Sequence, residues 1–95
     1  LSTRESSFEM FKNYGSVNHV ARLRKFAETT VEGHLSHFIR NGELDIARVV
    51  PAEKIRLISS FIKENPGVTN TAEIKNKLGE TVSYGEIRLV LSSLF

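Results

Sequence analysis

The chain contains no cysteine, and this absence excludes disulfide frameworks, thiolate zinc sites and cysteine nucleophiles. Long hydrophobic runs are also missing. The longest is Leu89-Val90-Leu91, whereas a helix that crosses a bilayer needs about 20 predominantly apolar residues. The first residues show no signal-peptide pattern. We therefore expect a soluble protein of the reducing cytoplasm that has no membrane partner.

Neither sign of charge dominates the sequence. Its 13 lysines and arginines face 11 aspartates and glutamates, which gives a net charge of +2. Because both halves of the chain are nearly balanced, any contact with nucleic acid must come from a local basic patch. Hydrophobic residues make up 40% and charged residues 25%, which excludes disorder, collagen and a coiled-coil rod. The length predicts one small domain over residues 1–95.

Hydrophobic residues recur at helical spacing along almost the whole chain, which predicts an all-α fold, a compact bundle of about six short helices. Val31, Leu35 and Phe38 share one stripe because they follow one another at i, i+4 and i+7. Capping boxes of the form Ser-x-x-Glu at 2–5 and 83–86 mark two helix starts. Residues 80–82 could instead pair briefly as a minimal wing, and Leu94 and Phe95 are expected to close the core. The predicted helices span about 3–14, 17–25, 29–41, 51–64, 71–78 and 84–94.

The most informative segment is 16–42. A helix of about eight residues, a turn of three or four and a longer helix with a polar outer face form a helix-turn-helix arrangement. In such an arrangement one helix supports the next, which projects into the DNA major groove. Residues 51–94 form a C-terminal helical unit, which we interpret as bracing the first. Its outward Lys75, Lys77 and Arg88 could also make a second DNA contact or a protein-docking surface.

The predicted DNA contacts fall into two groups. Small, polar and cationic side chains occupy the outer face of the helix near 29–41, and three cations crowd beside the preceding turn. Two observations oppose this interpretation: Glu28 and Glu32 would repel phosphate unless one accepts a proton from cytosine N4, and a basic run also fits a solvated face. The candidate DNA-binding residues are Arg22, Arg24, Lys25, Thr29, Thr30, Gly33, Ser36, His37 and Arg40.

The sequence gives little support for a metal site or for catalysis. His34 and His37 lie three apart on a helix and, with His19, could suggest a metal site, but zinc normally takes three or four ligands and no thiolate completes the set. We expect these histidines to pack or to contact phosphate, and no metal to bind. No Gly-x-Ser-x-Gly elbow, Gly-rich phosphate loop or His-Glu-x-x-His motif is present. We therefore expect no catalytic residues and no enzyme activity in this chain.

Three runs of residues carry a resemblance to a known family. The run 30–39 (TVEGHLSHFI), followed by Gly42-Glu43-Leu44-Asp45 and later by 82–91 (VSYGEIRLVL), resembles the helix-turn-helix domain found at the C-terminal end of RecQ-like and other bacterial DNA helicases. The resemblance covers nearly the whole chain. It implies an accessory DNA-binding module without a cofactor, whose ATPase motor lies upstream, although such domains also occur without a fused motor. One departure is Ala27, where these domains usually carry Thr or Ser, so the cap must come from Glu28, Thr29 or elsewhere.

These observations lead to one main hypothesis and two alternatives. The main hypothesis is a monomeric, non-catalytic domain that binds DNA for a helicase and also contacts the motor domain of its own parent chain. The start at Leu1 rather than Met indicates a fragment of a longer protein, with proteolytic removal of the start as the alternative. The first alternative function is a protein-docking module that uses the predicted helices 51–64 and 84–94. The second is a free-standing transcription regulator, which would need a dimer with reading helices about one DNA turn apart.

Overall fold

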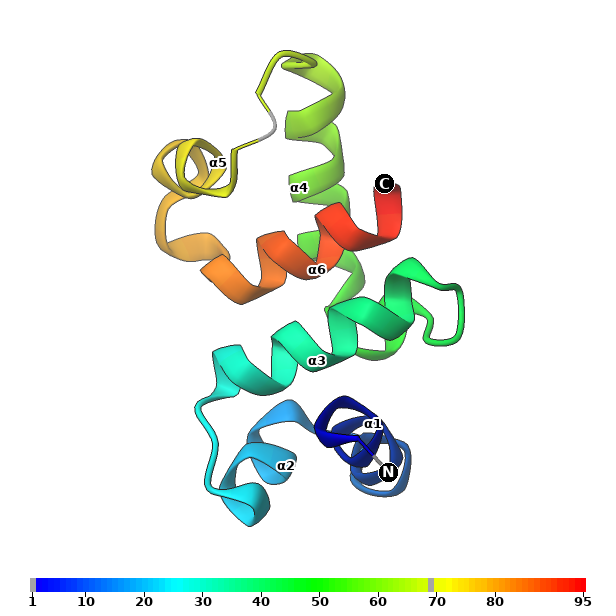
Figure 1. Cartoon of the computed structure of the whole chain (residues 1–95). Helices are drawn as coiled ribbons and strands as arrows, with labels where there is room; N and C mark the ends of the chain where they lie inside the picture. Colours follow the sequence, from blue (N-terminus) through cyan, green and yellow to red (C-terminus); the bar gives the residue numbers. More distant parts are fainter. Residues whose placement is uncertain (1, 69) are drawn as a thin grey trace.

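The third helix, α3 (Glu28–Arg40), lies at the centre of the fold (Figure 1). The computed structural model describes residues 2–68 and 70–95. In Figure 1, α1 (Thr3–Tyr14) and α2 (Val17–Arg24) lie below α3, and α6 (Tyr84–Leu94) lies above it. The other helices are α4 (Ala52–Glu64) and α5 (Thr71–Leu78), and the two short 3₁₀ turns are η1 (Ile46–Arg48) and η2 (Gly79–Thr81). The described residues form no strand, so the predicted all-α bundle is confirmed.

Side chains cap most of the helices, as the sequence predicts. The hydroxyl of Ser2 accepts from the Glu5 amide at 3.1 Å, and the Glu5 carboxylate accepts from the Ser2 amide at 3.0 Å. Ser83 and Glu86 form the same reciprocal pair at the start of α6. Such pairs satisfy amides that have no partner inside the helix. The two exceptions among the α-helices are α3 and α4, because their N-caps Ala27 and Pro51 make no side-chain hydrogen bond.

The prediction of a minimal wing at 80–82 is wrong. Residues Gly79–Thr81 form the 3₁₀ turn η2, and Val82 is extended but buried. The hydroxyl of Thr81 donates to the Leu78 carbonyl at 2.9 Å, and the Lys75 ammonium donates to the carbonyls of Gly79 and Val82. These bonds hold the segment against the end of α5, so its backbone cannot form a hairpin.

The core is built around α3. Its buried side packs against α1 and α2, and α6 runs alongside it on another side. Small residues occupy the facing sides of these two helices, Gly33 and Ser36 on α3 and Gly85 and Ser92 on α6, so the helices can approach closely. The buried hydrophobic residues are Phe8, Phe11, Val20, Ala21, Val31, Leu35, Phe38, Ile39, Leu44, Val50, Ile58, Ile74, Val82, Ile87, Leu89 and Val90.

The expectation that Leu94 and Phe95 close the core is wrong, because they are 47% and 74% exposed. The last buried positions of α6 are Val90 and Ser92, so the chain continues past the packed part of the helix. None of the helices in the described residues combines the length and apolar character that crossing a bilayer requires.

Candidate nucleic-acid interface

One strip of α3 reaches the surface. Thr29, Thr30 and Arg40 are exposed, while Gly33 and His37 are half-buried. At 100° per residue these five positions lie opposite the buried stripe of the helix. Two exposed arginines from other elements flank the strip, Arg4 from α1 and Arg88 from α6. We call this composite surface the arginine face; it consists of Arg4, Thr29, Thr30, Gly33, His37, Arg40 and Arg88.

Arg88 reaches α3 at Gly33. A Cβ at Gly33 would lie 3.5 Å from Nη2 of Arg88, so the guanidinium rests directly above the backbone of α3. Two turns further along α3 and one turn further along α6, Nη2 of Arg40 donates to the hydroxyl of Ser92 at 3.4 Å. The two helices therefore bring one guanidinium each to the same surface.

Arg4 reaches the arginine face from the opposite edge. Its Nη1 lies 3.1 Å from Nδ1 of His37. Because a guanidinium can only donate, Nδ1 accepts, and the proton of a neutral ring is on Nε2. Nδ2 of Asn41 lies 3.2 Å from Nε2, and because an amide nitrogen donates, Asn41 accepts from a protonated Nε2 only with its amide oxygen and nitrogen exchanged. Both ring nitrogens of His37 are thus engaged within the domain.

Arg24, a predicted DNA contact, ties α2 to α1. Its Nη1 donates to the Thr3 carbonyl at 2.7 Å and to the hydroxyl of Ser7 at 2.6 Å, and its guanidinium lies 4.8 Å from the centre of the Phe26 ring. The hydroxyl of the fully buried Ser7 also forms a hydrogen bond with Nδ1 of His34 at 2.8 Å, and the tautomer of His34 decides which atom donates. Burial lowers the pKa of His34, and the charges of Arg24 and Arg4 lower it further. Arg24 therefore has a structural role, although it adds positive charge behind the arginine face.

Arg22 and Lys25 do not join the arginine face. Both are exposed at the end of α2, and no hydrogen bond or ion pair among the described residues involves their side chains. Lys25 has a positive φ of 58° because it ends α2 in the left-handed conformation. Of the three cations that the sequence groups beside the turn, only Arg24 has its charge close to α3.

Ser36 is the predicted contact that lies deepest on the α6 side. It is half-buried, and its hydroxyl donates to the Gly33 carbonyl of the same helix at 2.7 Å. The polar side of α3 that the sequence identifies is therefore divided. Thr29, Thr30 and Arg40 are exposed, whereas Gly33, which lies beneath Arg88 of α6, and Ser36 are half-buried.

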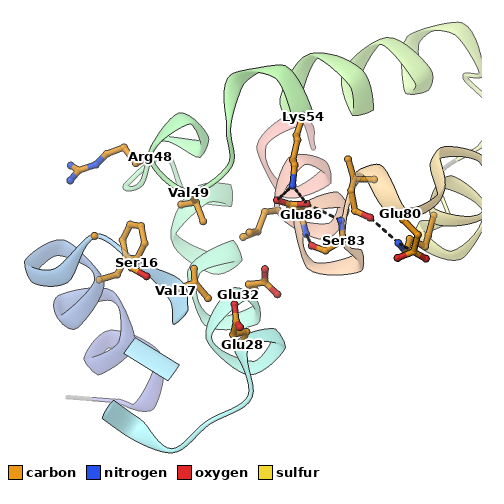
Figure 2. A pocket seen from close by; sticks show the side chains of 15 residues that line it. Ser16, Val17, Glu28, Glu32, Arg48, Val49, Lys54, Glu80, Ser83 and Glu86 are labelled. Atoms are coloured by element: carbon orange, nitrogen blue, oxygen red, sulfur yellow. Dashed lines mark hydrogen bonds and ion pairs between the residues drawn. The ribbon is translucent and has the colours of Figure 1, made fainter. Parts of the chain in front are cut away.

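The carboxylates that opposed DNA binding lie on another side of α3. Glu28 and Glu32 line a cavity of about 580 Å³, together with Ser16, Arg48 and Lys54. Figure 2 shows both carboxylates directed into the space below the Lys54–Glu86 ion pair, whose atoms lie 3.0 Å apart. Both acidic groups thus face the cavity, although the Glu32 carboxylate still interacts with Arg88 of the arginine face.

The arginines of the face form no salt bridge among the described residues, although the charge of Arg88 acts on the Glu32 carboxylate and opposes the rise in its pKa. The three salt bridges of the described residues all use lysine, in the pairs Lys12–Glu9, Lys54–Glu86 and Lys75–Glu80. Within residues 2–68 and 70–95, no arginine nitrogen lies within 4.0 Å of a carboxylate oxygen. Guanidinium groups bind planar oxyanions such as phosphate through paired donors.

Sequence reasoning did not identify Arg4, and it offered Arg88 only as part of a second DNA contact or a docking surface, not beside α3. Arg4 is 33 residues from its partner His37, and no local pattern shows which distant helix meets α3. The one available signal is the outward position of Arg88 on an amphipathic helix, and the choice of face depends on how α6 packs against α3.

The fold and the supporting helix α2 before α3 define an α-helical domain with a helix-turn-helix. Comparison with protein families agrees with this assignment, because a family described as a helix-turn-helix domain matches residues 3–91. The chain belongs to this helix-turn-helix family. No curated protein and no solved structure shows a significant match to the chain.

Proposed function

We propose that this domain binds DNA through the arginine face and performs no chemistry itself. The observation that carries the proposal is the convergence of Arg4, Arg40 and Arg88 on one side of α3, where none of the three is in a salt bridge among the described residues. Helix-turn-helix domains are associated with DNA binding, and phosphate neutralisation supplies much of the affinity of such proteins. A DNA partner is thus the function that both the family and the charge distribution favour.

A charge-matched pair of variants tests this proposal. The first variant replaces the three face arginines (Arg4→Gln, Arg40→Gln and Arg88→Gln), and the control replaces three exposed cations on α4 and α5 (Arg56→Gln, Lys63→Gln and Lys77→Gln). Both lose the same charge. Fluorescence anisotropy with a labelled 20-base-pair duplex should show at least roughly tenfold weaker binding for the first variant and a much smaller loss for the control. Equal losses would mean that the location of the charge does not matter, and the proposal would be wrong.

The helicase context is a finer part of the proposal. The three residue runs that resemble helicase C-terminal domains support it, as does the absence of a catalytic motif in the chain itself. We propose a parent chain that carries an ATPase motor upstream of Leu1 and uses this domain to hold DNA. The coding sequence upstream should then contain Walker-type motor motifs. An open reading frame without them would favour an independent factor.

Exposed apolar side chains favour protein docking as a second candidate function. Leu94 at the end of α6, Phe95 directly after it and Leu57 on α4 are all more than a third exposed. A docking surface for the motor domain would explain them. Leu94→Ser with Phe95→Ser should then weaken binding to the separately purified motor domain in calorimetric titration and leave duplex binding unchanged. Unchanged affinity for the motor would remove this function.

The transcription-regulator alternative requires a stable dimer. Our proposal needs only one copy of the domain. Sedimentation equilibrium should therefore give the mass of a monomer in the presence and absence of duplex DNA, and a dimer in both conditions would favour the regulator.

A further inference from the structure

We infer that the arginine face grips the sugar-phosphate backbone of duplex DNA and does not read base sequence. This inference rests on the proposed DNA-binding function and specifies its ligand. It departs from the expectation that α3 enters the major groove with its polar residues against base edges. Three features of the face carry it: the position of α6, the engaged polar side chains and the identity of the groups that remain.

The position of α6 limits how deeply α3 can enter a groove. A helix with its side chains is about 10–12 Å across, and the major groove is about 12 Å wide. A single helix therefore fills the groove. Here α6 runs directly alongside α3, and the Arg88 guanidinium covers the backbone at Gly33. Two helices side by side, with axes typically 8–10 Å apart, are too wide to reach the base edges together.

Two of the polar side chains of α3 that could distinguish bases are already engaged. The Ser36 hydroxyl donates to the Gly33 carbonyl, and both ring nitrogens of His37 have partners. Gly33 has no side chain to offer. The strip of α3 contains no Asn or Gln, which are the usual partners of adenine. The groups left to meet a base edge are the exposed Thr29 and Thr30 and the arginines, and their reach into the groove is limited by the position of α6.

The charged groups that the arginine face offers to a ligand are guanidinium groups. Arg88 lies at Gly33 and Arg40 is seven residues further along α3, which places them about 10 Å apart along the helix axis. Arg4 lies at the other edge of the strip, beside His37. Charges spread over such a surface can meet several phosphates of a duplex at once. Contacts with phosphates position a protein on DNA but carry no sequence information directly.

The composition of the face also favours duplex over single-stranded DNA. Proteins that bind single strands stack bases on exposed aromatic rings. The arginine face contains no Phe, Tyr or Trp, and the His37 ring stands edge-on to Phe38 at 5.0 Å. Tyr84 is the nearest candidate for stacking, because it is 45% exposed and lies one turn before Arg88 on α6. It therefore supplies a variant that separates the two ligands.

Fluorescence anisotropy with the intact chain tests the inference. The probes are four labelled 20-base-pair duplexes of unrelated sequence and their separate strands, measured across a salt series. We expect the four duplexes to bind with affinities within about threefold of one another, because phosphates are common to all sequences. Each single strand should bind more weakly. Arg88→Gln and Arg40→Gln should each reduce the slope of log K against log salt by about 0.9, and Tyr84→Ala should leave duplex binding unchanged.

Each other outcome has a distinct meaning. Binding of one duplex a hundredfold more tightly than the rest would overturn the inference but leave DNA binding intact. A preference for single strands that Tyr84→Ala abolishes would also overturn it and would identify a stacking surface. No binding to any probe at low salt would contradict the proposed function itself. The comparison among unmodified duplexes needs no variant, so it does not depend on how well a substituted chain folds.

Discussion

The carboxylate of Glu32 on α3 rests against the backbone of Gly85 on α6, in the space that a Cβ at Gly85 would occupy. Gly85 is buried, so this contact is part of the close approach between the two central helices. It joins the helix-turn-helix to the C-terminal unit and holds Arg88, three residues later, above α3.

Because of this contact, the effect of a substitution at Gly85 on stability should depend on the residue at position 32. Gly85→Ala should destabilise the wild-type domain, because the new methyl group must displace the half-buried Glu32 carboxylate. In a Glu32→Ala background the same substitution should be neutral or stabilising, since alanine favours helix more than glycine by about 1 kcal/mol. Urea unfolding of the four chains gives the coupling free energy, which we expect to exceed about 0.5 kcal/mol. Additive effects would show that the two residues do not meet.

Gly33 provides a matched contrast on the facing helix. A Cβ there would lie 3.5 Å from Nη2 of Arg88, which is an ordinary van der Waals separation. Gly33→Ala should therefore raise the free energy of unfolding by about 0.5–1 kcal/mol through helix propensity alone. Thermal unfolding measures this change, and a marked fall in stability would mean that α6 lies closer to α3 than described.

The protonation of Glu32 predicts a dependence of stability on pH. Burial raises its pKa above the ordinary value, as do the carboxylates of Glu28 and Glu86, although Arg88 opposes them. The folded state therefore holds the proton more tightly than the unfolded chain, so this group favours folding at low pH and loses that contribution as pH rises through its folded pKa. Glu32→Gln should be more stable than wild type at pH 7, and the advantage should shrink at pH 4. Denaturant titrations at both pH values check the sign.

The uncapped start of α3 predicts a simple gain in stability. Ala27 has the extended backbone of an N-cap, with φ −67° and ψ 151°, but its side chain cannot accept a hydrogen bond. Ala27→Ser should add about 1 kcal/mol to the free energy of unfolding. Ser16→Ala is the matched control, because Ser16 caps α2 by accepting from the His19 amide at 3.2 Å, and it should lose a similar amount. If Ala27→Ser has no effect, the start of α3 is already satisfied by another group.

Local sequence signals account for most of the fold. Caps at Ser2 and Ser83 and a left-handed glycine at Gly15 determine helix ends through contacts within four residues, so a pattern can reveal them. The apolar stripe of α3 likewise predicts which side is buried. The packing of α6 on α3 has no such local signal. Small residues such as Gly33 and Ser36 are compatible with an open surface as well as with a close helix contact.

The candidate site was therefore only partly predictable. Arg40 and the two threonines of α3 were predicted from the periodicity of one helix and do reach the surface. Arg4 and Arg88 join them only because distant helices meet α3. Arg24 was predicted as a phosphate contact because it is a cation beside the turn. The structure shows instead that its side chain is bonded to Thr3 and Ser7 within the domain.

Nuclear magnetic resonance titration with duplex DNA tests the central claim most directly. Amide shifts in the ¹⁵N-labelled domain should change most along the exposed side of α3, at the start of α1 and around Arg88. Residues that line the cavity near Glu28 and Lys54 should change little, because carboxylates there repel phosphate. Changes concentrated at that cavity or along α4, with the arginine face undisturbed, would contradict the account.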